Sequence, residues 1–192
     1  MRICVYTGTN TGARPLYREA AYAFGGLLAR EGIGLVYGGA SVGLMGAVAD
    51  GALAVGGEVI GIIPSALKGI EGAHEGLSEL RITATMHERK AAMAELSDAF
   101  VALPGGIGTF EEIFEVWTWS QLGVQSKPCA LLNAGGFYDR LVGFLDHVVE
   151  EKFVRPAHRA ILLVESDPVK LLRAIRNAHV PVISKVLRPG ET

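Results

Sequence analysis

Short, wholly apolar runs alternate with helical patterns along this chain, and this alternation restricts the fold more than any other feature. The apolar runs predict strands at residues 3–7, 33–37, 58–63, 80–84, 99–103, 129–132 and 161–164. Helical patterns fall between and after them, at residues 17–30, 48–55, 86–96, 138–150 and 168–177, with one more from the loop after residue 103 to about residue 122. Strands without polar residues are typical of parallel sheets that helices cover on both faces. The sequence therefore predicts a Rossmann-like, doubly wound α/β fold with a mostly parallel sheet of about six to seven strands.

The length and composition indicate one ordered domain. The chain has 192 residues, of which 49% are hydrophobic and 20% charged, so it can bury a substantial core. We expect a single nucleotide-binding domain over residues 1–179, with a frayed C-terminal tail over 180–192. Residues 65–80 are polar and interrupted by glycines, and we expect them to form a lid-like excursion from the sheet.

Charge and cysteine usage narrow the classes of function. The net charge of −2 predicts neither a nucleic acid polymer nor a membrane as partner. Cys4 and Cys129 each lie inside an apolar run, so we expect both to be buried rather than to bind a metal. The chain runs from Met1 directly into a predicted strand without a signal peptide pattern, which favours a cytoplasmic protein.

One glycine-rich loop joins a buried strand to a helix. It reads Leu103-Pro104-Gly105-Gly106-Ile107-Gly108-Thr109. Glycines let the backbone approach a ligand closely, and the unpaired N–H groups and positive dipole end of a helix favour an anion. In a doubly wound sheet such a loop lies at the carboxyl edge of the strands, where ligands bind. We therefore expect a phosphate group to bind here.

Two acidic residues follow this loop, and each has an alternative interpretation. Thr109 and Glu112 match a T-x-x-E capping box, in which Glu112 would only stabilise the start of the helix. The glycines before it are more than a helix start requires, which favours a functional carboxylate at Glu112. Glu111 points about 100° away on a helix, and we expect it to be solvated.

An arginine interrupts the apolar stripe of the helix over residues 86–96. Met86, Met93 and Leu96 form this stripe, and Arg89 occupies the position that joins them at helical spacing. Arg89 could form an ion pair with a neighbouring helix or extend to solvent, but the pattern favours an arginine that faces a ligand's anion or leaving group. Lys90 could add a second charge. Thr85 and Glu88 match a second capping box, in which Glu88 would bind the amide of Thr85.

Two familiar nucleotide motifs are missing from the positions that they would occupy. The loop after the first strand reads Gly8-Thr9-Asn10-Thr11-Gly12, which does not match G-x-G-x-x-G, and the chain has no G-x-x-x-x-G-K-[ST] loop. NAD and ATP are therefore not favoured as ligands.

Three ordered motifs identify a known family. Pro104 to Glu112 matches P-G-G-x-G-T-x-x-E, Met86 to Lys90 matches M-H-x-R-K, and Tyr37 to Gly46 matches Y-G-G-G-x-x-G-L-M-G. With them the chain, from Ile3 to about Phe153, resembles the LOG ("Lonely guy") family of cytokinin riboside 5′-monophosphate phosphoribohydrolases, formerly described as putative lysine decarboxylases. Two loops depart from the family pattern: Thr7-Gly8-Thr9-Asn10 replaces C-G-S-S, and Ala40 replaces a glycine.

The resemblance implies an activity, a set of site residues and an assembly. Family members hydrolyse the N-glycosidic bond of a nucleoside 5′-monophosphate, AMP or N6-modified AMP, and release the free base and ribose 5-phosphate without a cofactor. Arg89 and Glu112 match the family's catalytic residues. The positions that match its substrate contacts are Glu71, Met86, Lys90, Gly105, Gly106, Ile107, Gly108, Thr109 and Thr118. Members are homodimers or larger homo-oligomers with the site at an interface between subunits.

Two other functions compete with this hypothesis. The glycine-rich loop alone would also suit a non-catalytic protein that binds a nucleotide or another phosphate ligand. The older lysine decarboxylase description would require pyridoxal phosphate and a lysine that forms a Schiff base, and only Lys90 lies near the expected site.

Overall fold

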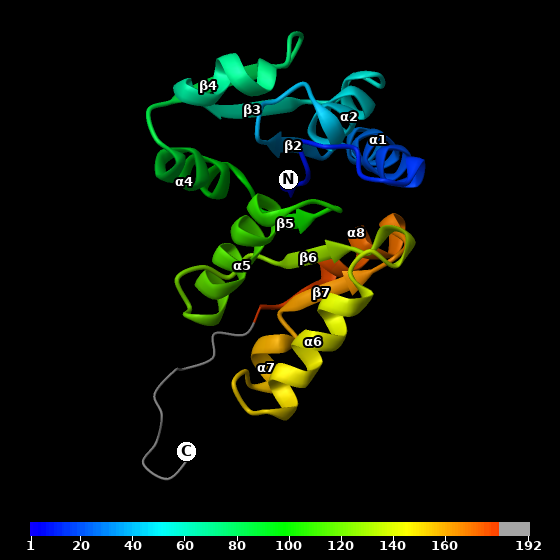
Figure 1. Cartoon of the computed structure of the whole chain (residues 1–192), viewed down its shortest axis with the longest axis vertical. Coiled ribbons are helices and arrows are strands. Elements are labelled where there is room, and N and C mark those ends of the chain that lie inside the picture. The colour runs from blue at the N-terminus through cyan, green and yellow to red at the C-terminus, as the bar shows by residue number, and fades with distance from the viewer. Residues whose placement is uncertain (181–192) are drawn as a thin grey trace.

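The protein forms one seven-stranded parallel sheet with helices on both faces (Figure 1). The computed structural model describes residues 1–180, apart from the side chains of Ile70 and Glu71. The strands are β1 (Arg2–Tyr6), β2 (Gly34–Tyr37), β3 (Val59–Pro64), β4 (Glu79–Thr83), β5 (Ala99–Ala102), β6 (Cys129–Leu132) and β7 (Leu162–Glu165). Their order is β4-β3-β2-β1-β5-β6-β7, and every neighbouring pair is parallel. The predicted fold class is confirmed, and all seven predicted strands are present.

The longer helices follow the strands in chain order. They are α1 (Pro15–Arg30), α2 (Gly43–Leu53), α4 (Met86–Leu96), α5 (Ile107–Gln121), α6 (Asp139–Glu150) and α8 (Pro168–Asn177). Four shorter helical segments are α3 (Ser65–Leu67), the π-helix η1 (Lys68–Gly72), the 3₁₀-helix η2 (Ala134–Gly136) and α7 (Pro156–Arg159). The sequence predicted the longer helices but none of the short segments. Residues 65–80, expected as an irregular excursion, hold α3, η1 and the start of β4.

Alternate residues of the inner strands face two separate hydrophobic cores. Ile3 and Val5 of β1 pack with α1, α2 and α8, whereas Cys4 and Tyr6 pack with α4, α5 and α6. Successive side chains of a strand point to opposite faces of the sheet, so a strand buried on both faces needs apolar residues at every position. This explains why the inner strands read as apolar runs, whereas the exposed edge strand β4 carries Glu79 and Arg81. Cys4 and Cys129 are free and buried, as predicted.

Helices α1 and α2 pack against each other through glycines. A methyl group on Gly25 of α1 would overlap the carbonyl oxygen of Val48, and one on Gly51 of α2 would overlap the carbonyl oxygen of Tyr22. The two backbones therefore lie closer together than side chains would allow. This close approach lets both helices cover the same part of the sheet, next to the loops that follow β1 and β2.

Three helices begin earlier in the sequence than predicted. α1 starts at Pro15, α2 at Gly43 and α5 at Ile107, because residues that were interpreted as loop already adopt helical geometry. The glycine-rich loops after β2 and β5 are correspondingly shorter. This difference changes the interpretation of Thr109 and Glu112.

Strand β1 lies at the centre of the sheet, between β2 and β5. The chain builds outward from β1 through β2, β3 and β4, then returns to the other side of β1 and builds outward through β5, β6 and β7. The loops that follow β1 and β5 therefore diverge at the carboxyl edge, at the switch point where doubly wound sheets bind ligands. Within residues 1–180, apart from the two side chains left out, no helix combines the length and apolar character that crossing a membrane requires.

We expect Gly25→Ala to lower the free energy of unfolding by about 1–3 kcal/mol, because the added methyl must push α1 away from α2. Urea denaturation followed by circular dichroism would measure it. Gly143→Ala is the matched control. It also lies inside a helix, but a methyl group there meets no atom within 4 Å, so we expect stabilisation by about 0.5–1 kcal/mol. Equal effects in the two variants would contradict the proposed packing.

Candidate active site

A cavity of about 860 Å³ opens at the carboxyl edge of the sheet. It lies beyond the ends of β1, β2 and β5, between the switch-point loops and helix α4. The residues that line it come from four stretches of chain before residue 70 and from three after it: Val5–Asn10, Gly12, Ala13, Tyr17, Gly38, Leu44, Met45, Leu67, Met86, Arg89, Met93, Pro104–Thr109, Glu111, Glu112 and Phe137. The cavity contains both predicted catalytic residues and the whole predicted phosphate loop.

The amino terminus of α5 opens into this cavity. Its N-cap is Gly106, and no side chain caps its first amides. Helix α2, which follows the neighbouring glycine-rich loop, differs, because the carbonyl oxygen of Gly8 accepts hydrogen bonds from the amides of Leu44 (3.0 Å) and Met45 (3.3 Å). A helix amino terminus without a capping side chain suits an anionic ligand. The loop before α5, rather than the one before α2, is therefore the better phosphate site.

The glycines of this loop meet two different requirements. A methyl group on Gly105 would overlap the hydroxyl of Thr109, whose side chain is buried and packs against that position. Gly106 and Gly108 are exposed and line the cavity, and a methyl group on either would meet no protein atom within 4 Å. Glycine at 105 is thus required by the fold, whereas glycine at 106 and 108 leaves space on the cavity side.

The loops after β1 and β5 are tied together. The hydroxyl of Thr7 donates to the carbonyl oxygen of Pro104 (2.9 Å), and the amide of Gly8 donates to the same oxygen (3.2 Å). The first loop, whose sequence departs from C-G-S-S, therefore has the hydroxyl of Thr7 where that pattern has a cysteine, and this hydroxyl holds the phosphate loop.

The predicted capping box at Thr109 is wrong. Because α5 begins at Ile107, Thr109 already lies in its first turn and Glu112 lies in its second turn. Glu112 therefore cannot cap the helix. Its side chain is half-buried and lines the cavity. Burial is the largest cause that raises the pKa of the Tyr6 phenol well above its ordinary value, and the neighbouring Cys4 thiol and the Glu112 carboxylate act in the same direction. Tyr6, which also lines the cavity, is therefore a neutral group near the carboxylate.

Arg89 is buried, with 5% of its surface exposed. Its Nε donates to the carbonyl oxygen of Ile62 (3.1 Å) and its Nη2 to that of Gly38 (3.2 Å), while Nη1 lies 3.8 Å from the sulfur of Met86. Arg89 lines the cavity, as the interpretation of a ligand-facing arginine in the apolar stripe requires. A guanidinium has five N–H donors, so two backbone carbonyls fix its orientation and leave further donors for a ligand.

The second predicted capping box is present at the start of α4. The hydroxyl of Thr85 accepts from the amide of Glu88 (3.1 Å), as predicted. The carboxylate of Glu88 accepts from the amide of Ala84 (2.9 Å) rather than from that of Thr85. This cap fixes the first turn of α4 and therefore the direction from which Arg89 enters the cavity.

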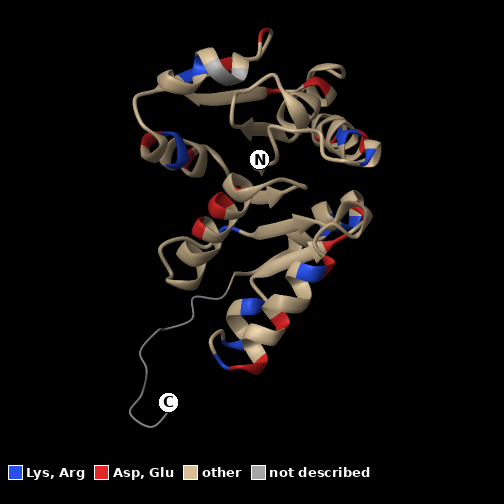
Figure 2. Cartoon of the chain, in the orientation of Figure 1, with Lys and Arg blue, Asp and Glu red and all other residues tan. Residues whose placement is uncertain are grey.

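Lys90 does not line the cavity. Its ammonium bridges α4 to α5 through Glu111 (2.5 Å) and Glu115 (3.0 Å), and Figure 2 shows basic residues on α4 beside acidic residues on α5. Although burial acts in the opposite direction, these two carboxylates raise the pKa of Lys90 above its ordinary value. Glu111 is exposed, as expected, and it also pairs with Lys90.

Of two further predicted substrate contacts, one lies away from this cluster and the other is untested. Thr118 is exposed on α5, and its hydroxyl donates to the carbonyl oxygen of Phe114 (2.7 Å). It lies eleven residues after Ile107, which corresponds to about 16 Å along the helix axis. The side chain of Glu71 lies outside the described residues, so its prediction stays untested.

Several cavity residues were not predicted from the sequence. Tyr17 and Phe137 pack edge to face, with ring centroids 5.6 Å apart, and line the side of the cavity next to α1. Leu67 lines it from α3. Phe137 follows the glycine pair Gly135-Gly136 after β6, a strand-end glycine signal that could have indicated it. No comparable signal marked Tyr17 or Leu67.

Comparisons with known proteins connect this geometry to a family. A family model described as possible lysine decarboxylase matches residues 45–175. A probable cytokinin riboside 5′-monophosphate phosphoribohydrolase from Oryza sativa subsp. japonica is 48% identical over 94% of this chain and 79% of its own length. Cytokinin riboside 5′-monophosphate phosphoribohydrolases from Rhodococcoides fascians (48%, over 91% and 89%) and Arabidopsis thaliana (46%, over 96% and 87%) are similarly close.

Solved structures share the fold. The molybdenum cofactor binding protein from Rippkaea orientalis superimposes with a TM-score of 0.69 and 26% identity, over 92% of this chain and 97% of the other. The molybdenum cofactor carrier protein from Chlamydomonas reinhardtii gives a TM-score of 0.70 at 22% identity, over 91% and 95%. At that identity the second likeness concerns the fold alone.

We expect Gly108→Ala to leave the melting temperature unchanged or slightly higher, because alanine has a higher helix propensity than glycine. We also expect this variant to lose the stabilisation that inorganic phosphate gives the wild-type protein. Differential scanning fluorimetry with and without phosphate would measure both. Gly105→Ala is the comparison: its methyl overlaps Thr109, so we expect the melting temperature itself to fall. Full phosphate stabilisation in Gly108→Ala would contradict the assignment of the loop.

Proposed function

Because this chain belongs to the LOG family of cytokinin riboside 5′-monophosphate phosphoribohydrolases, whose family model is described as possible lysine decarboxylase, we propose that it hydrolyses purine nucleoside 5′-monophosphates. The substrate is AMP or an N6-modified AMP. Water is the second reactant, and the products are the free base and ribose 5-phosphate. The observation that carries the proposal is that Arg89, Glu112 and the uncapped amino terminus of α5 line one cavity.

The phosphate loop determines where the bond to be cleaved lies. With the 5′-phosphate on the amides of residues 106–109, the ribose extends from the helix terminus into the cavity, toward Glu112 one turn further along α5. Cleavage of the bond between the base and C1′ develops positive charge on the ribosyl ring. The carboxylate of Glu112 stabilises that charge and accepts a proton from the attacking water. The alternative role for Glu112, as a cap of α5, is excluded because α5 begins at Ile107.

Arg89 acts on the other end of the bond. As C1′ loses the base, the electron pair of the bond moves to the base, which leaves with negative charge until it gains a proton. A guanidinium held on the carbonyls of Gly38 and Ile62 cannot swing away, so its remaining donors are oriented before the substrate binds. Met45, Met86 and Met93 line the cavity around it, and their flexible side chains suit a flat purine of variable substitution.

The non-catalytic alternative also has support. The structural neighbours include proteins named as binding or carrier proteins for the molybdenum cofactor, so this fold also occurs in proteins with such names. The presence of both Arg89 and Glu112 in the cavity favours the enzyme. Release of free adenine from AMP would distinguish the two functions, because a binding protein would be stabilised by AMP without producing adenine.

Pyridoxal phosphate, which the family description implies, does not fit this site. Among the described side chains no lysine lines the cavity. Lys90, the nearest along the sequence, is held by Glu111 and Glu115, which keep its ammonium charged. A Schiff base requires a neutral amine, so the residues of this site argue against decarboxylase chemistry.

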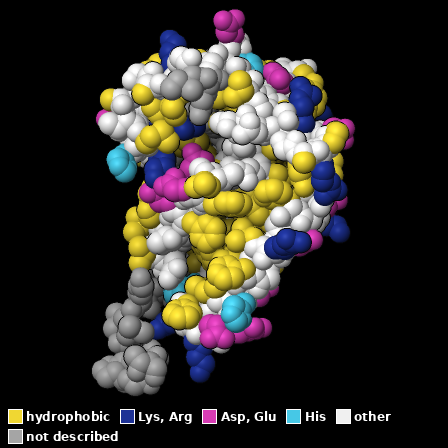
Figure 3. All heavy atoms as spheres, viewed as in Figure 1, with side chains coloured by type: hydrophobic (Ala, Val, Ile, Leu, Met, Phe, Trp, Pro, Cys, Tyr) yellow, Lys and Arg dark blue, Asp and Glu magenta, His cyan; other side chains and the backbone are white. Residues whose placement is uncertain are grey.

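The exposed side chains support a homo-oligomer that completes the site. Thr118 is too far along α5 to reach a nucleotide on the loop of its own chain, but an antiparallel α5 of a second copy would bring it to that chain's loop. Ile107 (87% exposed) is the first residue of α5, Val124 (71%) lies in the turn that follows α5, and Phe144 (60%) lies on α6. Figure 3 shows hydrophobic side chains gathered on this face, between α5 and α6. We infer that a second copy covers part of this surface.

We expect Glu112→Gln to lower kcat for adenine release from AMP by about a hundredfold or more, because the charge is lost while the shape is kept. Chromatography of the released base would measure the rate. Glu111→Gln is the matched control: the neighbouring carboxylate pairs with Lys90, so we expect a loss of less than about threefold, in line with an exposed ion pair. Unchanged turnover in Glu112→Gln would refute a catalytic role for this carboxylate.

Mixed oligomers would test the shared site. Thr118→Asp places a negative charge beside the phosphate of the partner's nucleotide, so we expect it to be inactive, as Glu112→Gln is. A mixed dimer of the two variants contains one site with both native residues, so co-refolding should restore about a quarter of the wild-type activity. Analytical ultracentrifugation of each variant would show that assembly is intact. If mixing restores nothing in intact dimers, Thr118 does not serve the partner's site.

A further inference from the structure

The segment between β3 and β4 is fastened to the glycine-rich loop that follows β2. The carbonyl oxygen of Gly72 accepts hydrogen bonds from the amide (2.9 Å) and the hydroxyl (3.2 Å) of Ser41. The amide of His74 donates to the carbonyl oxygen of Gly39 (3.0 Å), and Ala73 forms an antiparallel bridge with Ala40. We call residues 72–74 the strap, because they hold the end of this excursion on the neighbouring loop.

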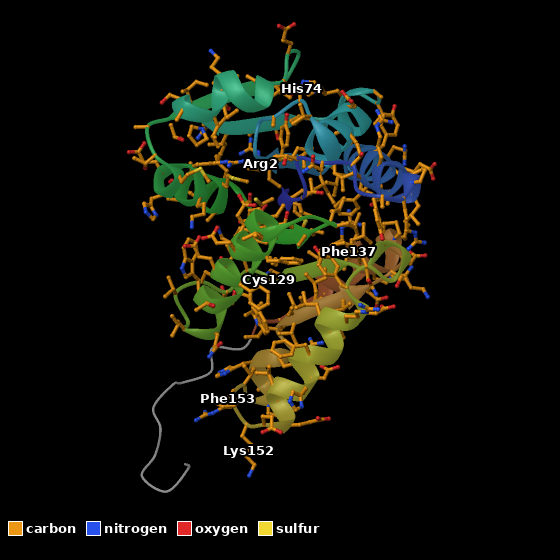
Figure 4. All side chains as sticks on the ribbon, in the orientation of Figure 1. Arg2, His74, Cys129, Phe137, Lys152 and Phe153 are labelled. Atoms are coloured by element: carbon orange, nitrogen blue, oxygen red, sulfur yellow. The ribbon has the colours of Figure 1, made fainter. Side chains whose placement is uncertain are left out.

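The side chain of His74 extends the strap to helix α2. Its Nε2 lies 3.0 Å from a carboxylate oxygen of Asp50, and its Nδ1 lies 2.6 Å from the carbonyl oxygen of Glu75. Both partners are acceptors, so the ring can donate a hydrogen bond to either of them. The side chain is 12% exposed, and Figure 4 labels it beside the helical segment that follows β3.

The part of the excursion before the strap has little packing of its own. Its described residues in α3 and η1 are exposed or half-buried, and none is buried. Gly69 has no protein atom within 4 Å of the position that a methyl group would take. Leu67 nevertheless lines the cavity. Hydrophobic burial therefore does not fix the described side chains of this stretch, and its position depends on β3 at one end and on the strap at the other.

The strap and the catalytic arginine share one support. The loop that receives the strap at Gly39 and Ser41 begins with Gly38, whose carbonyl oxygen holds Arg89. Asp50 lies on α2, the helix into which the same loop leads. The π-helix η1 lies between Leu67 and the strap, and such turns often occur at functional sites. The segment that borders the cavity and the anchor of Arg89 are thus joined through residues 38–41.

We propose that His74 and Asp50 are positioning residues for substrate binding, an inference that rests on the proposed function. Their contact holds residues 65–72 against the cavity, so that Leu67 borders the nucleoside. Neither residue touches the reacting atoms. Loss of the contact frees the segment, which weakens substrate binding while the phosphate loop, Arg89 and Glu112 remain in place.

Steady-state kinetics with AMP would test this role in His74→Ala, Asp50→Ala and the double variant. We expect KM to rise about tenfold in each single variant with kcat within about twofold, because an interaction made equally in the ground and transition states is lost. The double variant should be no worse than either single one, as for two residues that act through one contact. An unchanged KM, or a fall in kcat alone, would overturn the proposal.

Tyr37→Phe is the matched control, since Tyr37 lies on the strand that leads into the same loop. Its hydroxyl is buried and, within the described chain, has no hydrogen-bond partner, and the residue does not line the cavity. Removing such a hydroxyl is close to neutral, so KM should stay at the wild-type value. A rise in KM equal to that of His74→Ala would mean that any change near α2 disturbs the site, and the specific contact would be rejected.

Hydrogen exchange provides a readout that does not require activity. We expect the amides of residues 65–74 to exchange at least about tenfold faster in His74→Ala than in the wild type, with exchange in β1 and β5 unchanged. If the wild-type protein released no base from any monophosphate, the proposed function would fail while this measurement would still report on the strap. Unchanged exchange at residues 65–74 would refute the anchoring role.

Discussion

Much of the site depends on one buried cation. Removing a guanidinium from water is costly unless hydrogen bonds replace its hydration, and Arg89 finds them at the carbonyl oxygens of Gly38 and Ile62. These carbonyls lie near the carboxyl ends of β2 and β3, where the parallel ladder ends and acceptors become available. A side chain at position 38 would overlap the guanidinium. The arginine on α4 thus requires glycine at position 38, 51 residues earlier, so the first glycine of the Y-G-G pattern is a consequence of the M-H-x-R-K element.

The glycines of the phosphate loop have a different physical explanation. A glycine at position 105 makes room for the buried Thr109, whereas Gly106 and Gly108 border open space. The fold alone therefore explains one of the three glycines, and the other two make sense only for a ligand that comes close to the backbone. The same comparison separates α5 from α2, whose first amides already have the carbonyl oxygen of Gly8 as acceptor.

The sequence predicted the strands well because burial on both faces of a parallel sheet leaves no choice but continuous apolar residues. It predicted helix starts poorly. Gly43 and Ile107 follow or belong to glycine-rich stretches that resemble loops, yet their backbones are already helical, because tertiary contacts rather than propensity decide them. The capping box at Thr109 failed for the same reason, whereas the one at Thr85 was right, because no glycine obscured the helix start. Tyr17 and Leu67 could not be predicted, since only the packing of α1 and α3 brings them to the cavity.

The different supports of the elements around the cavity explain its position at the carboxyl edge of the sheet. At the switch point the loops after β1 and β5 lead to opposite faces of the sheet. The space between them forms the cavity, so neither hydrophobic core has to be interrupted.

One wall of the cavity is the start of α5, which is rigid because β5 leads into it. The opposite wall carries Arg89, fixed by the ends of β2 and β3. The segment from Ser65 to Gly72 follows β3 directly, and its other end is held by the strap and by the contact between His74 and Asp50. A nucleotide that binds here therefore meets two preformed walls and one whose position depends on a polar contact. Variation among related proteins in the size of base accepted would then be expected in residues 65–74 rather than in the phosphate loop.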